Sequence, residues 1–247
     1  MTTAAPSKII GEKEAAFLQI TFLGHCGFAV DTGAHILLFD YAPRRCAARA
    51  EALLPGLLRG RAPLVFVSHA HRDHYCEEIW NFPEARYFLG CGVPTRKDAR
   101  VFSGGETFSD GTLTLETFPS TDEGVAFLVR IDGHSIYHAG DLGWWYWPGE
   151  PDPWNPDMER AFLAQAKRIA AQPINLAFLH ADPRQREGWL LGLDWLMRHG
   201  DIRHAVPMHF WNLRSIPAKV AEADCTAPYR DRLVTALCTC GDAVTLE

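Results

Sequence analysis

The sequence predicts an α/β fold in which sheets are covered by helices. Its first half carries short, closely spaced strand candidates, whereas its second half alternates helical and strand patterns. This order is typical of packed layers of sheet and helix. With 247 residues, 47% of them hydrophobic, the chain can bury a sizeable core. Few Pro/Gly-rich segments interrupt the pattern, so we expect residues 1–16 to be a loose lead-in and residues 17–247 to form a single domain.

The first half carries strand signals separated by glycine-containing turns. Short apolar runs predict strands at residues 17–22, 28–31, 36–40, 64–67, 87–89, 112–118, 126–131 and 135–137. The turn at 32–33 indicates an antiparallel meander, and the Asp-Gly turn at 132–133 indicates a hairpin. Alanines and leucines predict a helix over residues 45–58, although Pro55 weakens its end.

Helical periodicity appears in the second half. Asp157 is a candidate N-cap, and the residues after it form an apolar stripe along a helix expected at 158–172. A second, more apolar helix is expected at 188–199. Buried strands are predicted at 174–179 and 205–207, and the chain should end in a helix and a final strand.

The composition argues against several functional classes. The net charge is −6 and no Lys/Arg run occurs, so no nucleic-acid partner is expected, because phosphate binding needs clustered basic side chains. No apolar run is long enough for a membrane span, and the first residues lack the apolar core of a signal peptide. The seven cysteines contain no C-x-x-C pair, which favours reduced core thiols. We therefore expect a cytoplasmic protein with a small-molecule substrate, and the sequence says nothing about its oligomeric state.

Metal-ligand side chains gather after three of the predicted buried strands. The densest group, SHAHRDHY at residues 68–75, directly follows the strand at 64–67. The ligand-type residues after the three strands are His69, His71, Asp73, His74, Asp141 and His209. Sites in α/β proteins usually lie at the carboxyl ends of strands, and imidazoles and carboxylates bind zinc, iron or manganese. The sequence therefore predicts a metal centre of the kind that activates water for hydrolysis.

The stretch HAHRDH at residues 69–74 resembles the signature of the metallo-β-lactamase superfamily. The opening TFLGHCGF, Gly140-Asp141 after a strand and a late His209 are similar as well, in the same order, so the resemblance covers nearly the whole chain. LGHCGF and IYHAGDLG (residues 136–143) look closest to the branch that contains the ascorbate-phosphate lactonase. The resemblance implies a four-layer αββα sandwich with one or two divalent metal ions between the sheets.

The resemblance also implies roles for the ligands. The first ion would be held by His69 and His71, and the second by Asp73, His74 and His209. Asp141 would bridge the ions, and a metal-activated hydroxide between them would attack an electrophilic carbonyl or phosphorus. Asp73 would also orient that hydroxide and pass its proton to the leaving group. The implied function is a metal-dependent hydrolase that acts on a small ester, lactone, thioester or phosphodiester.

One ligand of the superfamily pattern is missing from this chain. A histidine is expected between two of the predicted strands, where the segment at 119–124 reads PSTDEG. We expect Asp122 to take its place, with Glu123 as the second choice and Thr121 as the third. A carboxylate would shift the preference of the site from zinc toward manganese or iron. In the alternative, this ligand is absent, the first site is weak or empty, and the chain is a metal-binding sensor or scaffold without hydrolytic turnover.

Five further side chains are candidates for contacting the substrate or orienting the ligands. Trp144 and Trp145 belong to the run WWYW and would either wall the substrate pocket or pack a loop onto the core. His180 and Asp182 follow a predicted strand and would either orient metal ligands or cap a loop. His25, in the first turn, would either border the site or be structural.

Overall fold

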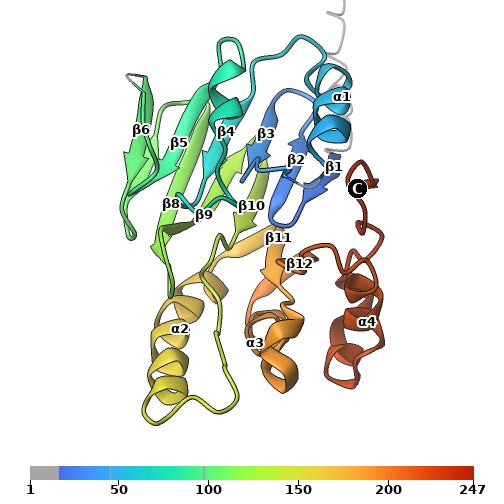
Figure 1. The fold of residues 1–247 in the computed structure, drawn as a ribbon. Helices are drawn as coiled ribbons and strands as arrows, with labels where there is room; N and C mark the ends of the chain where they lie inside the picture. The colour runs from blue at the N-terminus through green and yellow to red at the C-terminus, as the bar shows by residue number, and fades with distance from the viewer. Residues whose placement is uncertain (1–16, 45, 97) are drawn as a thin grey trace, which may run out of the picture.

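The structure is a computed structural model that describes residues 17–44, 46–96 and 98–247 (Figure 1). The lead-in predicted at 1–16 and the first residue of the helix predicted at 45–58 lie outside the described residues. The described part of the chain contains two mixed sheets.

The first sheet has the strand order β13-β1-β2-β3-β4-β5-β6. Its strands are β1 (Leu18–Gly24), β2 (Gly27–Asp31), β3 (Ile36–Phe39), β4 (Leu64–Val67), β5 (Arg86–Gly90), β6 (Ala99–Phe102) and β13 (Ala243–Leu246). Strands β13, β1, β2 and β3 pair antiparallel, which confirms the predicted meander, and β3 to β6 pair parallel.

The second sheet has the order β12-β11-β10-β9-β8-β7. Its strands are β7 (Thr107–Ser109), β8 (Leu113–Pro119), β9 (Val125–Ile131), β10 (His134–His138), β11 (Pro173–His180) and β12 (Asp201–Met208). Strands β10 to β12 are parallel and β7 to β10 antiparallel, and the predicted hairpin turn at 132–133 joins β9 to β10.

Helices cover the outer faces of both sheets. They are α1 (Ala47–Leu58), α2 (Trp154–Ala170), α3 (Leu191–His199) and α4 (Ile216–Glu222), with 3-10 segments η1 (Glu77–Asn81), η2 (Pro183–Gly188) and η3 (Asp224–Arg232). Figure 1 shows α1 beside the first sheet, and α2 and α3 beside the second. In the part that the structure describes, no helix is both long and apolar enough to cross a membrane.

The alternation of side chains along the strands creates the layers. Phe28 and Phe39 of the first sheet face the second sheet, where their ring centroids lie 4.2 and 6.0 Å from that of Phe178 on β11. Leu38, the residue before Phe39 on β3, faces the opposite way and packs in the cluster that contains Ala50 of α1. The order of layers is therefore helix, sheet, sheet, helix, as predicted.

The structure corrects three expected element boundaries. Helix α2 begins at Trp154, not after a cap at Asp157, because the first turn tolerates Pro156. The helix expected at 188–199 starts only at residue 191, since the chain up to Gly188 forms η2. Strands β6 and β7 were not predicted, because they are short, mostly exposed edge strands without a clear apolar alternation.

The predicted ligands all come from loops at one end of the sandwich. The loops follow β1 (with His25), β4 (with His69 to His74), β8 (with Asp122), β10 (with Asp141), β11 (with Asp182) and β12 (with His209), and His180 is the last residue of β11. The topology therefore brings together side chains that lie more than 180 residues apart in the chain.

Candidate metal centre

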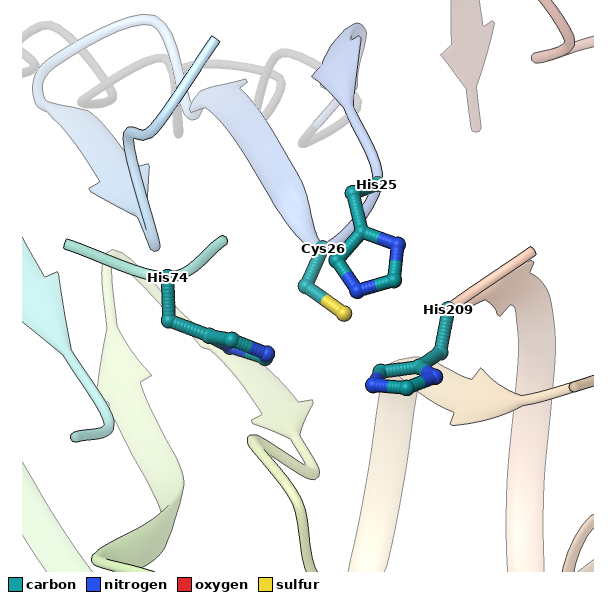
Figure 2. Close-up of side chains that lie close together, drawn as sticks. All are labelled: His25, Cys26, His74 and His209. Atoms are coloured by element: carbon teal, nitrogen blue, oxygen red, sulfur yellow. The ribbon is translucent and has the colours of Figure 1, made fainter. Parts of the chain in front are cut away.

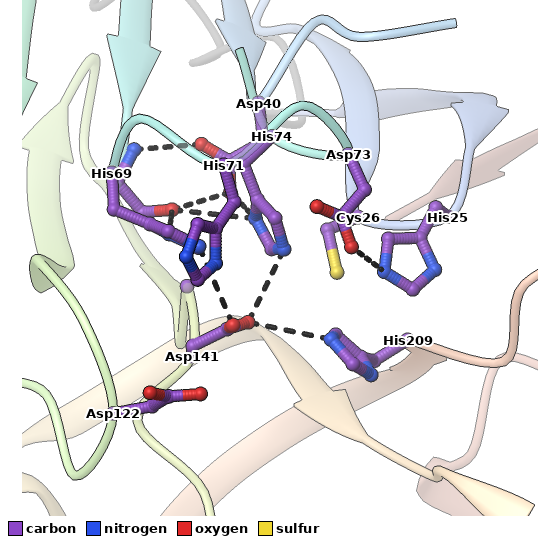
Figure 3. Close-up of polar contacts among 12 residues, drawn as sticks. His25, Cys26, Asp40, His69, His71, Asp73, His74, Asp122, Asp141 and His209 are labelled. Carbon is purple, nitrogen blue, oxygen red and sulfur yellow. Dashed lines mark hydrogen bonds and ion pairs between the residues drawn. The ribbon is translucent and has the colours of Figure 1, made fainter. Parts of the chain in front are cut away.

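The carboxylate of Asp141 lies at the centre of three imidazoles (Figure 3). Its Oδ2 is 3.4 Å from Nε2 of His69. Its Oδ1 is 3.2 Å from Nε2 of His74 and 3.4 Å from Nε2 of His209. Three of the predicted ligands, His69, His74 and His209, thus direct Nε2 toward a fourth, Asp141.

Each of these imidazoles is held at Nδ1 by another group. Nδ1 of His74 lies 2.7 Å from the Asp40 carboxylate, and Nδ1 of His209 lies 2.9 Å from the Asp182 carboxylate. Nδ1 of His69 lies 3.0 Å from the Ser68 hydroxyl. The Ser68 hydroxyl itself donates to Asp40, so it accepts from His69. With a proton at Nδ1, each ring turns the lone pair of Nε2 toward Asp141, which is the orientation that a metal ligand needs.

The pKa values follow from this arrangement. Burial lowers the pKa of His69 to about 4, and the same cause lowers that of His25 to about 4, so both rings are neutral. Burial also acts to lower the pKa of His209, but its contacts with the carboxylates of Asp141 and Asp182 outweigh burial and raise this pKa to about 9. A protonated His209 supplies a positive charge to Asp141, and a bound cation would displace that proton.

Several buried atoms of the cluster lack a hydrogen-bond partner among the described residues. They are Nε2 of His25, His69 and His74 and Oδ1 of Asp141. A buried polar atom without a hydrogen-bond partner lowers the stability of the fold. The Asp141 carboxylate and the imidazole lone pairs that face it would be stabilised by a cation bound between them. The residues therefore fit a divalent ion.

The donor atoms fall into two groups, each spanning no more than 4.8 Å. One consists of His69, His71 and Asp141, and the other of His25, Cys26, His74 and His209. Figure 2 shows the thiol of Cys26 directed into the space between the three rings of the second group. Two groups of donors are compatible with one bound ion or with two. The sequence did not single out Cys26, because a buried lone cysteine has the pattern of a core residue.

Asp73 lies at the edge of the cluster and belongs to neither group of donors. Its carboxylate is half-buried and lies 3.4 Å from Nε2 of His25. Burial acts to raise the pKa of Asp73, but the contact with His25 and the charge of His74 hold this pKa well below its usual range. Asp73 is thus an ionised carboxylate at the wall of the pocket.

The loop between β8 and β9 presents Asp122 to the cluster. Asp122 lines the same pocket as His71 and Asp141. Burial and the charge of Asp141 raise the pKa of Asp122, as expected for a carboxylate close to another one. Glu123 instead lies 3.4 Å from Nε2 of the exposed His71, and the Thr121 hydroxyl donates to the Gly143 carbonyl at 2.6 Å.

Close backbone packing around Ser68 fixes the start of the histidine loop. A Cβ at Gly90 or Gly124 would come within 1.9 or 2.1 Å of the Ser68 carbonyl oxygen, and one at Gly140 would come within 2.6 Å of the Ser68 Cβ. Gly124 also has a φ of +72°, a conformation that favours glycine. Gly90 at the end of β5 and two loop glycines, Gly124 and Gly140, thus allow the backbone to pack closely against Ser68, next to His69.

Strained backbone is concentrated at the site. Among the described residues with a positive φ that are not glycine are His25 (52°), Asp40 (41°), His209 (64°) and Trp211 (56°). Such conformations cost of order 1 kcal/mol or more each and persist where the surrounding structure imposes them. The loops that carry the donors are therefore held in place and not free to relax.

Two of the predicted orienting residues and one unpredicted residue contact the cluster. Asp182 holds His209, as given above, and Nε2 of His180 donates to the Gly140 carbonyl at 2.7 Å, 3.8 Å from Asp141. Asp40 was missed, because an aspartate that ends a strand carries no signal of its own in the sequence.

A pocket of about 450 Å³ opens beside the cluster. Trp145 lines it and donates from Nε1 to the Asp141 carbonyl at 3.0 Å. Trp144 does not line it: its ring packs on Phe162 of α2, with centroids 5.6 Å apart, which is the second of the two alternatives that the sequence left open. Neighbours in a loop point in opposite directions, and the sequence alone does not say which of them faces the core.

Comparisons with known proteins identify the family of the chain. A family model described as the beta-lactamase superfamily domain matches residues 19–145, about half of the chain. A protein of Nitratidesulfovibrio vulgaris named UPF0173 metal-dependent hydrolase is 30% identical over 218 residues, which cover 78% of this chain and 80% of the relative. One of the same name from Pelotomaculum thermopropionicum is 28% identical over 51% of this chain, and the match spans 63% of that relative's length, which is less than two thirds.

A solved structure has a similar fold. Igni18, a metallo hydrolase from Ignicoccus hospitalis, matches with a TM-score of 0.68 and 19% sequence identity, over 94% of this chain and 99% of its own. At this identity the likeness is one of fold.

Proposed function

The chain belongs to the beta-lactamase superfamily, in a family of metal-dependent hydrolases, and from this premise we propose that it hydrolyses a small molecule at the Asp141 cluster. The observation that carries the proposal is the aim of three Nε2 atoms, from His69, His74 and His209, at one buried carboxylate. Burying such a donor set costs free energy, and a cation bound to it would offset that cost.

The donors divide between two metal positions. His69, His71 and Asp122 would hold one ion, and His74 and His209 the other, with Asp141 shared between them. A divalent ion bound here would lower the pKa of a water and polarise the substrate. Zinc suits the imidazoles and the nearby Cys26 thiol, whereas manganese or iron would be favoured by Asp122.

The protein's own groups supply the rest of the chemistry. Asp73 is ionised and lines the pocket, so it can accept a proton from the attacking water and pass it to the leaving group. Asp40 and Asp182 keep the imidazoles of His74 and His209 in the orientation that binds metal. We propose an ester, lactone, thioester or phosphodiester as the substrate, since the pocket volume suits a small molecule.

Metal content tests the proposal directly. Elemental mass spectrometry should find about two ions per wild-type chain, and about one in the variant Asp122→Ala. Glu123→Ala distinguishes between the two candidate carboxylates, because Glu123 lies 3.4 Å from Nε2 of His71, and this variant should keep the wild-type content if Asp122 is the ligand. One ion or none in the wild type, unchanged in Asp122→Ala, would favour the sensor or scaffold without turnover, which the missing histidine supports.

Activity gives the second test. The metal-loaded protein should hydrolyse members of a panel of 4-nitrophenyl esters, thioesters, lactones and bis(4-nitrophenyl) phosphate, and Asp141→Ala should lose both metal and turnover. An Asp141→Ala variant with normal turnover would refute the proposal. The single domain at 17–247, the cytoplasmic location, the lack of a nucleic-acid partner and the likeness to the ascorbate-phosphate lactonase branch stay predictions.

A further inference from the structure

One wall of the pocket beside the metal cluster is lined by tryptophan. Four of the chain's eight tryptophans line it, namely Trp145, Trp147, Trp154 and Trp211, and Met158 of α2 joins them. They come from the loop after β10, from the start of α2 and from the loop after β12. Large apolar rings that line a pocket beside a polar cluster are typical of a ligand site.

The rings are fixed in place before any ligand binds. The Asn155 side chain accepts from the Trp147 N–H and donates to its carbonyl, both at 2.9 Å, which ties this loop to α2. The planes of Trp145 and Trp147 differ by only 6°, with centroids 6.3 Å apart. Trp154 lines the pocket and is 45% exposed, so part of its indole is open to solvent. A planar ring could lie on such surfaces at little cost in side-chain entropy.

A guanidinium group sits among these rings. The central carbon of Arg184 lies 5.7 Å from the ring centroid of Trp147 and 5.1 Å from that of Trp211. Nε and Nη2 of Arg184 donate to the Asp182 carboxylate, which fixes the plane of the group. The side chain is half-exposed in the pocket, and no described residue accepts a hydrogen bond from Nη1. A rigid, partly free guanidinium is suited to bind an anionic oxygen.

Resting on the proposed function, we infer that the substrate is a small molecule with a planar aromatic ring and an anionic group, the ring lying on the tryptophan wall and the anion on Arg184. The acidic residues of the pocket, Asp73, Asp122 and Asp141, would repel an anion in the metal-free protein. Metal ions offset these charges, so the ligand should bind the loaded protein and not the metal-free one. The volume of about 450 Å³ accommodates one or two fused rings and not a polymer.

Equilibrium binding to the metal-loaded full chain tests this inference without turnover. The probes are 1-naphthylacetate, its neutral amide, cyclohexylacetate and acetate, measured by isothermal titration calorimetry. We expect 1-naphthylacetate to bind about tenfold more tightly than each of the other three. Arg184→Gln should abolish the advantage over the amide, and Trp147→Leu should abolish the advantage over cyclohexylacetate. 1-Naphthyl phosphate, tested in parallel, identifies the anion as phosphate if it binds more tightly than the acetate and as carboxylate if it does not.

Matched variants on α3 serve as controls. Arg198→Gln removes an arginine that pairs with Asp194, and Trp195→Leu removes a ring that stacks on His199, and neither should alter binding. The metal content of each variant is measured, and Arg184→Lys is added because it keeps the charge without the planar fork. It should bind 1-naphthylacetate more weakly than the wild type does.

Two results would overturn the inference. Equal affinity of the wild type for 1-naphthylacetate and acetate would mean that the ions alone bind the acid. An Arg184→Gln variant that keeps its metal and the preference for acid over amide would exclude Arg184. Hydrolysis of the ester panel, measured on the same preparation, separates the two proposals: turnover without ring and anion preference refutes only this inference, and preference without turnover refutes only the hydrolase.

Discussion

Replacing Asp40 by asparagine tests how the site sets the orientation of His74. Asp40 is 1% exposed; its Oδ1 accepts from the Ser68 N–H, and its Oδ2 accepts from the Ser68 hydroxyl and from Nδ1 of His74, each at 2.7 Å. The Ser68 N–H can only donate, so the amide oxygen of the asparagine must stay opposite it. The NH₂ group then faces Nδ1 of His74, which has to accept. The imidazole proton moves to Nε2, the atom that faces Asp141.

This change should weaken metal binding and should also lower the stability of the metal-free fold. Loss of the partner that orients a metal-bound histidine lowers metal affinity about 10- to 100-fold, or about 1.4 to 2.7 kcal/mol. In the metal-free protein, charge-assisted hydrogen bonds become neutral ones of similar shape. We expect the free energy of unfolding to fall by about 2 kcal/mol, since hydrogen bonds to a charged group contribute about 1.5 to 3 kcal/mol.

Competition with a chromophoric zinc chelator measures the affinity, and urea unfolding of the metal-free protein measures the stability. Asp132→Asn is the matched control, because Asp132 also accepts from a histidine, His35, at 2.8 Å, but in the turn between β9 and β10 and outside the cluster. The reasoning is refuted if Asp40→Asn binds zinc within about twofold of the wild type, whatever its stability.

Three further predictions concern stability. Gly124→Ala places a Cβ 2.1 Å from the Ser68 carbonyl oxygen at a φ of +72°, so urea titration should find a free energy of unfolding lower by about 3 kcal/mol, and an unchanged midpoint would contradict this. Burial acts to raise the pKa of Asp31, but hydrogen bonds from Arg61 and the Gly33 N–H outweigh it and lower this pKa. The stability that the ionised Asp31 carboxylate contributes is present above the ordinary pKa of aspartate. It is lost as the pH falls through the lowered pKa of Asp31 in the folded protein. Asp31→Asn should therefore cost about 1 kcal/mol at neutral pH and nothing in strong acid, and a pH-independent difference in urea titrations would refute the pairing. A chelator should lower the unfolding temperature by roughly 5 to 10 °C, because ligand at 100 times its Kd stabilises by about 2.7 kcal/mol, and calorimetric traces that coincide with and without metal would speak against a bound ion.

The buried strands and the polar residues that follow them were predictable, because a buried strand appears in the sequence as a short run of apolar residues. Strand β4 is a run of four apolar residues in both the prediction and the structure, and the densest histidine segment follows it. The position of Asp141 after β10 was predicted for the same reason. Parallel neighbours align their carboxyl ends, so the order of the strands alone brings such residues to one edge.

Contacts between remote side chains were not predictable. Asp40 reaches His74 across two adjacent strands, and Arg184 reaches Trp211 across two loops, and no local pattern announces either contact. Cys26 has the pattern of a core thiol, although its neighbours are three imidazoles. The direction of Trp144 depends on the packing of α2, which starts four residues earlier than its capping signal indicates.

Both sheets contribute donor residues to the cluster. His69, His71 and His74 follow a strand of the first sheet, whereas Asp141 and His209 follow strands of the second. An ion held by both sets is a cross-link between the halves of the sandwich, so the halves cannot separate without releasing it. Linkage is reciprocal, and any substitution that loosens the aromatic contacts between the sheets should weaken metal binding from a distance. Metal affinity would then report on the packing of core residues that lie far from the ligands.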